Sequence, residues 1–229
     1  MKILVKYPSR ERAVLFESTL NKCIDNQTTS VLYLISLDIT DPQLYKYEEI
    51  CDKYENLLYT TNYSASKIEA VNRDVNQFMH VKWDILVLLS DDMICQKGGW
   101  DQIIIDKMTE LYPDTDGVLW FSDGHTKLNT MCIIGRKYYE RFRYIYNPEY
   151  TSLWSDNEFQ EVAQMLGKTN IEPFECIFEH QHFSTSPNIK ADTLMKKNEK
   201  FYNIDQKVYK NRRLNNFDLE KEDNIWKTK

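Results

Sequence analysis

The chain has 229 residues, a net charge of −6, and aliphatic and aromatic residues along its whole length. That length buries one sizeable core and leaves little room for a second. The acidic balance excludes a protein whose whole surface binds nucleic acid, although it allows a local basic patch. The five cysteines are odd in number and have no CxxC spacing, which excludes a disulfide framework and a zinc knuckle and favours buried, reduced thiols.

The beginning of the chain, MKILVKYPSR, lacks the long apolar centre of a signal peptide. No run along the chain approaches the roughly 18 consecutive apolar residues that a membrane-spanning helix needs. Together with the reduced thiols, these features predict a soluble protein of the cytoplasm.

Apolar runs of strand type alternate with segments of helical periodicity through the first half of the chain. The predicted strands are residues 2–7, 31–37, 57–59 and 84–89. A predicted helix follows each strand, and the third helix begins at the cap Ser66 and carries Ile68, Val71, Val75 and Phe78. The fourth strand is the most apolar, which predicts a central position covered on both faces.

The second half is less regular, with predicted strands at residues 117–121 and 131–135 and predicted helices at about residues 136–142 and 156–166. The alternation predicts an α/β domain with a mostly parallel central sheet flanked by helices. Its ligand site is expected beyond the carboxyl ends of the strands. Residues 196–213 are basic and poor in aliphatic side chains, which predicts a tail or a peripheral helix.

Asp91 and Asp92 stand directly after the most apolar strand. Neither carboxylate can enter a core unpaired, and two carboxylates repel each other in a dry site. A divalent cation resolves both problems, since Mg²⁺ and Mn²⁺ take oxygen ligands and bridge the phosphates of a bound diphosphate. An isolated Asp-Asp pair more often begins a turn and caps a helix, but its place after a buried strand favours the metal interpretation.

The segment 83–93, WDILVLLSDDM, resembles the strand and DxD-type motif of GT-A glycosyltransferases, particularly the family-2-like inverting enzymes. Other segments agree with that family in order, between residues 2 and 183. The resemblance implies a single GT-A, Rossmann-like domain over residues 1–190, followed by a basic C-terminal extension over residues 191–229. Within the domain it implies a donor half of about residues 1–100 and an acceptor half of about residues 101–190.

The resemblance also implies contacts to a nucleotide-sugar, the donor of the sugar in such enzymes. The loop after the first strand, with Pro8 and Arg10, is similar to the family's loop near the nucleotide. Asp38, at the end of the second strand, resembles the acidic contact of the base or ribose. Lys67 and Asn72 resemble the segment that precedes the DxD strand. All five residues are therefore predicted to lie around a nucleotide-sugar.

Metal and catalytic roles follow from the same resemblance. Asp92 is the first-choice metal ligand, and Asp91 is a second ligand or a ribose contact. His180 and His182 match the late histidine that completes the metal shell. Their rings are predicted to point to opposite sides, so that only one reaches the metal. Asp156, in the segment WSDNEF that opens a helix, is the predicted catalytic base, although taken alone it fits an N-cap equally well.

Two features depart from the family pattern. Ser90 replaces the first acidic residue of the DxD triplet, which shifts the ribose contact to Asp91 or removes it. The usual Asp-Asp-Gly-Ser after the second strand is reduced to DITD at residues 38–41. These departures leave the identity of the nucleotide open.

The implied reaction is a metal-dependent, inverting transfer of a sugar from a nucleoside-diphosphate-sugar to a hydroxyl acceptor, with Mn²⁺ or Mg²⁺ as cofactor. A base takes the proton of the attacking hydroxyl, and the cation stabilises the departing diphosphate. One alternative is a catalytically inactive GT-A-like module that binds a glycan or a nucleotide. Another is a nucleotidyltransferase, which the lack of glycine in residues 8–12 disfavours.

The acceptor stays open among a polysaccharide, a lipid-linked sugar, a protein and a hydroxylated DNA base, which would have to be turned out of its duplex. Trp120 and Trp154 are the best candidates for acceptor contacts, and His125, in an expected turn, is a weaker one. The aromatic residues between 138 and 150 are expected to pack in the core. The basic segment contacts an anionic acceptor or a membrane surface, or is simply a solvated face.

Overall fold

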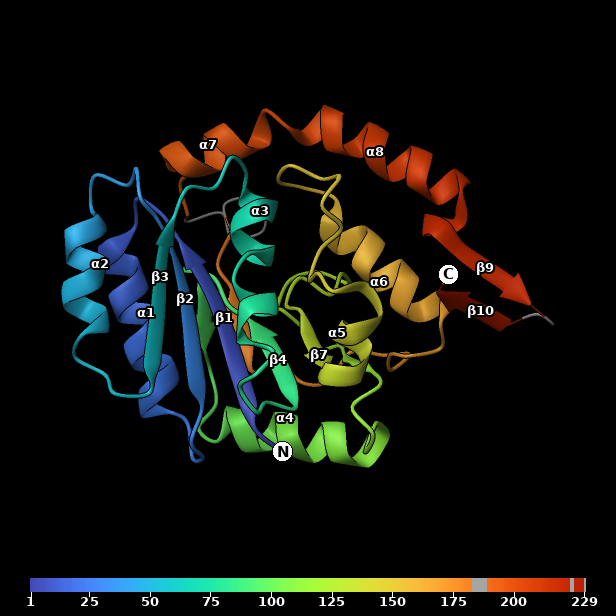
Figure 1. Cartoon of the computed structure of the whole chain (residues 1–229), viewed down its shortest axis with the longest axis horizontal. Coiled ribbons are helices and arrows are strands. Elements are labelled where there is room, and N and C mark those ends of the chain that lie inside the picture. Colours follow the sequence, from blue (N-terminus) through green and yellow to red (C-terminus); the bar gives the residue numbers. More distant parts are fainter. Residues whose placement is uncertain (183–188, 223–224, 229) are drawn as a thin grey trace.

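The computed structural model describes residues 1–182, 189–222 and 225–228. Its central sheet has the strand order β3 (Leu57–Asn62), β2 (Leu32–Asp38), β1 (Ile3–Ser9), β4 (Ile85–Leu88), β7 (Ile133–Gly135) and β6 (Val118–Leu119). The first four strands are parallel, whereas β7 pairs antiparallel with both of its neighbours. The predicted α/β class, with a mostly parallel sheet flanked by helices, is confirmed (Figure 1).

Helices cover both faces of this sheet. One face packs against α1 (Ala13–Asp25), α2 (Leu44–Cys51) and α4 (Trp100–Leu111). The other face packs against α3 (Lys67–Asn72), α5 (Arg136–Phe142) and α6 (Ser155–Met165). Successive side chains of β1 alternate between the two cores, because a strand points its side chains to opposite faces in turn.

β1 continues two residues beyond the predicted strand, through Pro8 and Ser9. Proline is tolerated there because β1 pairs with β4 only from Ile3 to Lys6. The missing N–H of Pro8 faces the side on which β4 has already ended, so no ladder hydrogen bond is lost.

The helix predicted to carry residues 68–78 is two shorter elements, α3 and the 3-10 helix η1 (Val75–Phe78). Its predicted cap is confirmed, since the hydroxyl of Ser66 accepts the N–H of Glu69 at 3.0 Å. The prediction of one continuous helix is wrong, because the backbone leaves the helical conformation at Arg73 and Asp74.

A buried ionic network beneath α3 explains this interruption. Asp74 has a left-handed backbone, with φ of 76°, and its carboxylate accepts hydrogen bonds from the hydroxyls of Ser36 and Thr60. The same carboxylate lies 3.7 Å from the Nζ of Lys6, and burial lowers the pKa of that lysine to about 7. A helix continued past α3 would carry the carboxylate away and leave Lys6 buried without a counter-charge.

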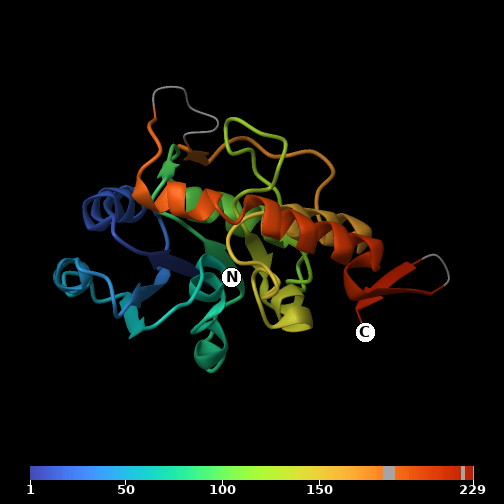
Figure 2. The ribbon, with the colours of Figure 1, turned by 90° about the horizontal axis from the view of Figure 1, so that it is seen from above.

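The C-terminal segment is folded onto the domain. It forms α7 (Thr193–Glu199), α8 (Tyr202–Leu214), the 3-10 helix η2 (Asn216–Asp218) and the hairpin of β9 (Leu219–Glu222) and β10 (Ile225–Thr228). α7 and α8 cross the edge of the sheet at which the parallel strands end (Figures 1 and 2). Of the two predictions for this basic segment, the helical one is therefore confirmed.

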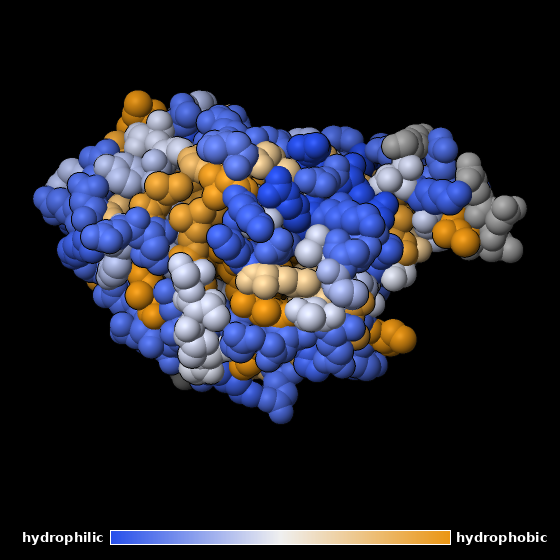
Figure 3. Space-filling model, turned by 60° about the horizontal axis from the view of Figure 1, so that its bottom comes forward, coloured by the Kyte–Doolittle hydropathy of each residue, from blue (hydrophilic) through white to orange (hydrophobic). Residues whose placement is uncertain are grey.

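The hairpin projects from one end of the molecule, beside a surface that is mostly hydrophilic in the view from below (Figure 3). Its base is not isolated, because Leu219 and Trp226 pack with Val162 of α6. None of the helices in the described part of the chain is long and apolar enough to cross a membrane.

Arg212 ties α8 to α6. Its guanidinium donates two hydrogen bonds to the buried carboxylate of Glu158, from Nε at 2.8 Å and from Nη2 at 3.0 Å. It also donates to Glu149 at 2.6 Å and to Asp218 at 2.9 Å, while Tyr150 donates to Glu158 at 2.7 Å. Because only 5% of the Arg212 side chain is exposed, this ion pair belongs to the interior.

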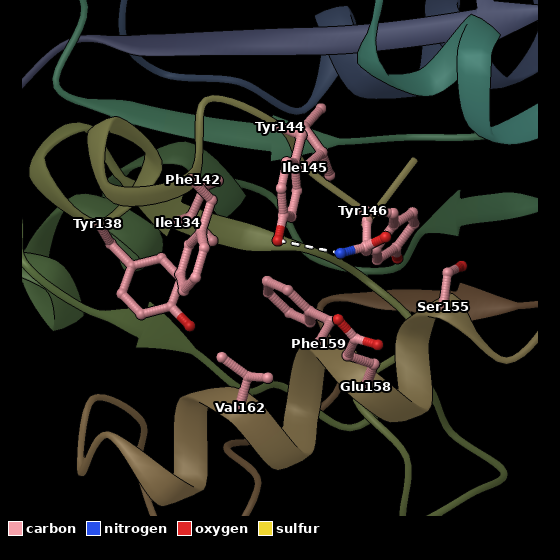
Figure 4. A pocket seen from close by; sticks show the side chains of 11 residues that line it. Ile134, Tyr138, Phe142, Tyr144, Ile145, Tyr146, Ser155, Glu158, Phe159 and Val162 are labelled. Carbon is pink, nitrogen blue, oxygen red and sulfur yellow. Dashed lines mark hydrogen bonds between the residues drawn. The ribbon is translucent and has the colours of Figure 1, made fainter. Parts of the chain in front are cut away.

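A small, largely apolar cavity lies between α5, residues 144–147 and α6 (Figure 4). Its aromatic and aliphatic lining includes Tyr138, Phe142, Tyr146, Phe159 and Val162. The aromatic residues of this region therefore pack in the core, as expected. Neither Asp92 nor Asp156 lines the cavity, so the predicted chemistry lies elsewhere.

Replacing Arg212 with Ala leaves the carboxylate of Glu158 buried without its cation. We expect the free energy of unfolding to fall by about 3–5 kcal/mol, the usual cost of removing one partner of a buried pair. Urea unfolding followed by circular dichroism measures the change. Arg213→Ala is the matched control, since it removes an exposed arginine that pairs with Glu161 and should leave stability nearly unchanged. Equal losses in the two variants would contradict the interior role of Arg212.

Candidate functional site

The parallel strands end at one edge of the sheet, and most of the predicted site residues gather there. β1 ends at Ser9, β2 at Asp38 and β4 at Leu88. Asp91 and Asp92 follow β4 within four residues. Two carboxylates in succession thus leave the sheet at its central strand.

Asp91 turns into the protein. It is 4% exposed, its Oδ1 accepts the hydroxyl of Ser9 at 2.8 Å, and its carbonyl accepts the hydroxyl of Thr19 at 2.8 Å. Burial raises the pKa of Asp91 to about 7, and the charge on Asp92 adds to that rise. Asp91 thereby joins β1 and α1 to the end of β4. This placement favours a supporting role over the donor contact predicted from the sequence.

Asp92 faces the other way, toward a set of polar and cationic side chains. Its Oδ1 accepts the hydroxyl of Ser90 at 2.5 Å and lies 3.6 Å from the Nε2 of His180. Its Oδ2 lies 3.7 Å from Arg12. Burial alone would raise the pKa of Asp92, but the nearby imidazole of His180, the hydrogen bond from Ser90 and the charge on Lys67 hold this pKa well below the usual range. Asp92 is therefore an ionised carboxylate.

A two-stranded sheet brings the late histidines to this carboxylate. β5 (Met93–Cys95) pairs antiparallel with β8 (Phe178–His180), which places Met93 opposite His180. Both histidine rings lie on one side, with their centroids 5.6 Å apart, so the predicted opposite orientation is wrong. The reason is that side chains two residues apart in an extended segment share a face, so alternation does not separate these rings. The N–H of His182 also bonds back to the carbonyl of His180 at 3.0 Å. Burial lowers the pKa of His182, which favours its neutral form.

Asp156 and Lys67 complete the same neighbourhood from the opposite side of the sheet edge. Asp156 lies in the first turn of α6, and Lys67 is the first residue of α3. Burial raises the pKa of Asp156, and the positive charge of Lys67 opposes the rise. The same lysine charge acts on Asp92 and His182. Asp156, Lys67, Asp92 and His180 therefore share one electrostatic environment.

A second group lies at the ends of β1 and β2. The Nη1 of Arg10 donates to Asp38 at 2.8 Å, and its Nη2 donates to the hydroxyl of Thr40 at 3.1 Å. Asp38 also accepts the backbone N–H of Ser64 at 3.3 Å. Although burial opposes the change, the bonds from Thr40 and the charge on Arg10 lower the pKa of Asp38. With Pro8 in β1 beside them, the predicted nucleotide contacts of this loop are brought together.

Asn72 does not join either group. Its side-chain oxygen accepts the backbone N–H groups of Ile145 and Tyr146 at 2.9 and 3.0 Å, and its Nδ2 donates to the carbonyl of Tyr146 at 2.6 Å. These three bonds hold the end of α3 to residues 145–146. The side chain is thus occupied within the fold.

Two residues near Asp92 were not predicted from the sequence. Arg12 lies 3.7 Å from Asp92 and donates to Asp192, the N-cap of α7, at 2.8 Å. Glu11 has a positive φ of 58°, and the chain turns there just before Arg12. The second arginine of the PSRER loop was the available signal for Arg12. Asp192 carried none, because its pairing depends on how α7 crosses the sheet edge.

The predicted acceptor contacts are divided by the fold. Trp120 is buried, with 6% of its surface exposed, and His125 lies 3.4 Å from Glu179. Trp154 has a left-handed backbone directly before α6, and its ring packs against Tyr202 and Tyr209 of α8. Among the three, Trp154 is therefore the one beside Asp156.

The side chains around Asp92 were tested for their fit to a divalent cation. Within residues 1–182 and the later described ranges, no three His, Cys, Asp or Glu side chains are arranged to hold a metal ion. Asp92 and His180 nevertheless form a carboxylate and imidazole pair 3.6 Å apart, and His182 is close by. Mg²⁺ and Mn²⁺ commonly take one or two protein ligands and complete their shells with phosphate oxygens and water. The pair fits a cation that is shared with a diphosphate.

No protein-family model and no curated protein sequence matches this chain. Solved structures do match it. The mannosyltransferase PcManGT from Pyrobaculum calidifontis, in complex with GDP-Man and Mn²⁺, aligns with a TM-score of 0.61 at 13% identity, over 76% of this chain and 56% of that chain.

TarS from S. aureus aligns with a TM-score of 0.61 at 13% identity, over 80% of this chain and 37% of that one. Its segment 1–349 in complex with UDP-GlcNAc aligns with a TM-score of 0.60 at 13% identity, over 83% of this chain and 62% of that one. The chain thus spans between about a third and two thirds of the length of these structures. At such identities the match concerns the fold: this chain has a GT-A-like glycosyltransferase fold.

Proposed function

We propose that this protein is a metal-dependent inverting glycosyltransferase that moves a sugar from a nucleoside-diphosphate-sugar to a hydroxyl acceptor. The observation that carries the proposal is the meeting of Asp92, His180, Lys67 and Asp156 at the carboxyl edge of the sheet. An ionised carboxylate, Asp92, and a second carboxyl group of raised pKa, Asp156, both lie within reach of the Lys67 charge. Such a division of properties between two acidic residues suits one for ligand binding and the other for proton transfer.

The donor lies along the edge from β2 to β4. The Arg10 and Asp38 pair contacts the nucleoside, and the cationic groups of Arg12 and Lys67 face the diphosphate. Asp92 and His180 would hold Mn²⁺ or Mg²⁺, and the bound cation would supply charge stabilisation for the departing diphosphate. The fold supports this assignment, because its neighbours PcManGT and TarS were solved with GDP-Man and UDP-GlcNAc, respectively.

Asp156 is the base. Its carboxylate takes the proton of the acceptor hydroxyl while that oxygen forms a bond to the anomeric carbon. The bond from this carbon to the diphosphate breaks, and the diphosphate leaves with the electron pair, so the configuration inverts. A raised pKa makes the carboxylate of Asp156 a stronger base at neutral pH. The positive charge of Lys67 opposes that rise and favours the ionised form.

Adjacent carboxylates provide a matched test of the donor site. Asp92→Asn should weaken binding of a nucleotide-sugar in the presence of MnCl₂ by about tenfold or more, because it removes the charged ligand. Asp91→Asn keeps an acceptor for Ser9 and should bind the donor as the wild type does. Calorimetric titration with UDP-GlcNAc and GDP-mannose measures both. Equal donor affinity in wild type and Asp92→Asn would remove the basis for the metal and donor assignment.

A second variant separates catalysis from binding. Asp156→Asn should lower the rate of sugar transfer, or of slow donor hydrolysis with water as acceptor, by about 10²–10⁴-fold. Donor affinity should stay unchanged, since Asp92 and Lys67 are untouched. Released nucleoside diphosphate reports the rate. A normal rate in this variant would show that Asp156 is not the base, and an inactive wild type that binds donor would instead indicate a GT-A-like binding module.

The pH dependence follows from the raised pKa of Asp156. A protonated carboxyl group cannot accept the proton of the acceptor, so the rate should fall as the pH drops through that pKa. The fall should begin at a higher pH than the usual aspartate value of about 3.9 implies. Rates measured from pH 4 to 8 at saturating donor, with donor affinity measured in parallel, test this. A rate that stays constant down to pH 4 would contradict it.

A further inference from the structure

We infer that Asp205 of α8 is a positioning residue for the catalytic carboxylate of Asp156. The inference rests on the proposed function, because it takes Asp156 as the base. It extends the active site to α8, the helix that carries Asp205.

Asp205 is fully buried and binds three successive backbone amides. Its Oδ1 accepts the N–H of Thr151 at 3.0 Å, and its Oδ2 accepts the N–H groups of Ser152 and Leu153, each at 2.8 Å. Hydrogen bonds to an ionised carboxylate are roughly twice as strong as neutral ones. One side chain on α8 therefore fixes the conformation of the whole segment 151–153.

This segment leads directly into the catalytic turn. Trp154 follows it with a left-handed backbone, α6 begins at Ser155, and Asp156 is the next residue. The ring of Trp154 packs against two tyrosines of the same α8 that carries Asp205. A left-handed non-glycine residue is strained and persists only where its surroundings hold it. The contacts of α8 thus maintain the turn that aims Asp156.

The same segment is also bonded from the other side. The carbonyl of Thr151 accepts the N–H of Ile68 at 3.2 Å, and Ile68 follows Lys67 in α3. Residues 151–153 therefore connect α8 with the lysine that acts on Asp156. Loss of the Asp205 carboxylate would loosen the spacing between Lys67 and Asp156. Asp92, directly before β5, and His180, in β8, would keep theirs, because β5 pairs with β8.

Asp101 provides a matched control. It lies at the start of α4 and is also fully buried. Its carboxylate accepts the backbone N–H groups of Thr28 and Thr29. Those residues precede β2, so the contact lies at the amino edge of the sheet, opposite to the site. Asp101→Asn and Asp205→Asn each place an amide N–H₂ against backbone donors and should cost comparable stability.

The experiment compares both variants with the wild type, using hydrolysis of UDP-GlcNAc or GDP-mannose in MnCl₂ at a temperature where all three are folded. We expect Asp205→Asn to lower kcat at least tenfold with donor Kd within about twofold. We expect Asp101→Asn to change neither. Hydrogen exchange should show faster exchange of the amides of residues 151–153 in Asp205→Asn only.

Each outcome decides the inference. A wild-type kcat in Asp205→Asn, or an equal loss in Asp101→Asn, would overturn it and leave the proposed function intact. Unchanged exchange at residues 151–153 would overturn the clamp itself. A wild type that neither hydrolyses the donor nor transfers its sugar would overturn the proposed function, and with it the positioning role of Asp205.

Discussion

The site depends on the opposite orientations of two neighbouring carboxylates, Asp91 and Asp92, in the turn after β4. β4 is central and fully buried, so the chain that leaves it has to satisfy every charge it carries. Asp91 meets this condition by turning inward to Ser9, and Asp92 meets it by facing Arg12, Lys67 and His180. The inward contact of Asp91 fixes the turn after β4, and this turn lets Asp92 face the opposite way. Ser90, directly before the two carboxylates, bonds to Asp92 and holds it in this orientation.

Much of this arrangement was predictable from local pattern. Strand and helix periodicities located the sheet, and the apolar run at residues 84–89 identified its central strand. The position of Asp92 and Asp38 followed, because parallel strands end at one edge. The family resemblance predicted His180 near Asp92, and the strand period itself, read correctly, puts His182 on the same side, because residues two apart share a face.

Long-range contacts explain what the sequence did not predict. Asp74 breaks the helix after Asn72 because Lys6, on another strand, needs its charge. Asn72 resembled a donor contact but is occupied by residues 145–146. The basic composition of residues 196–213 suggested a solvated face, yet Asp205 and Arg212 within it are buried and joined to α6 and its preceding loop. Composition averages over a helix, whereas these roles belong to single inward positions.

The joining of α8 to residues 151–158 has a consequence for biosynthesis. Residues 1–182 contain the sheet and both carboxylates of the site, and they leave the ribosome before α8 does. Until α8 arrives, Glu158 lacks Arg212, and the amides of residues 151–153 lack their acceptor. The carboxyl edge of the sheet, with Asp92, can thus form early during translation, whereas the turn before Asp156 is completed only when a helix about fifty residues further along the chain has been made. The order of synthesis separates the assembly of the two halves of one site.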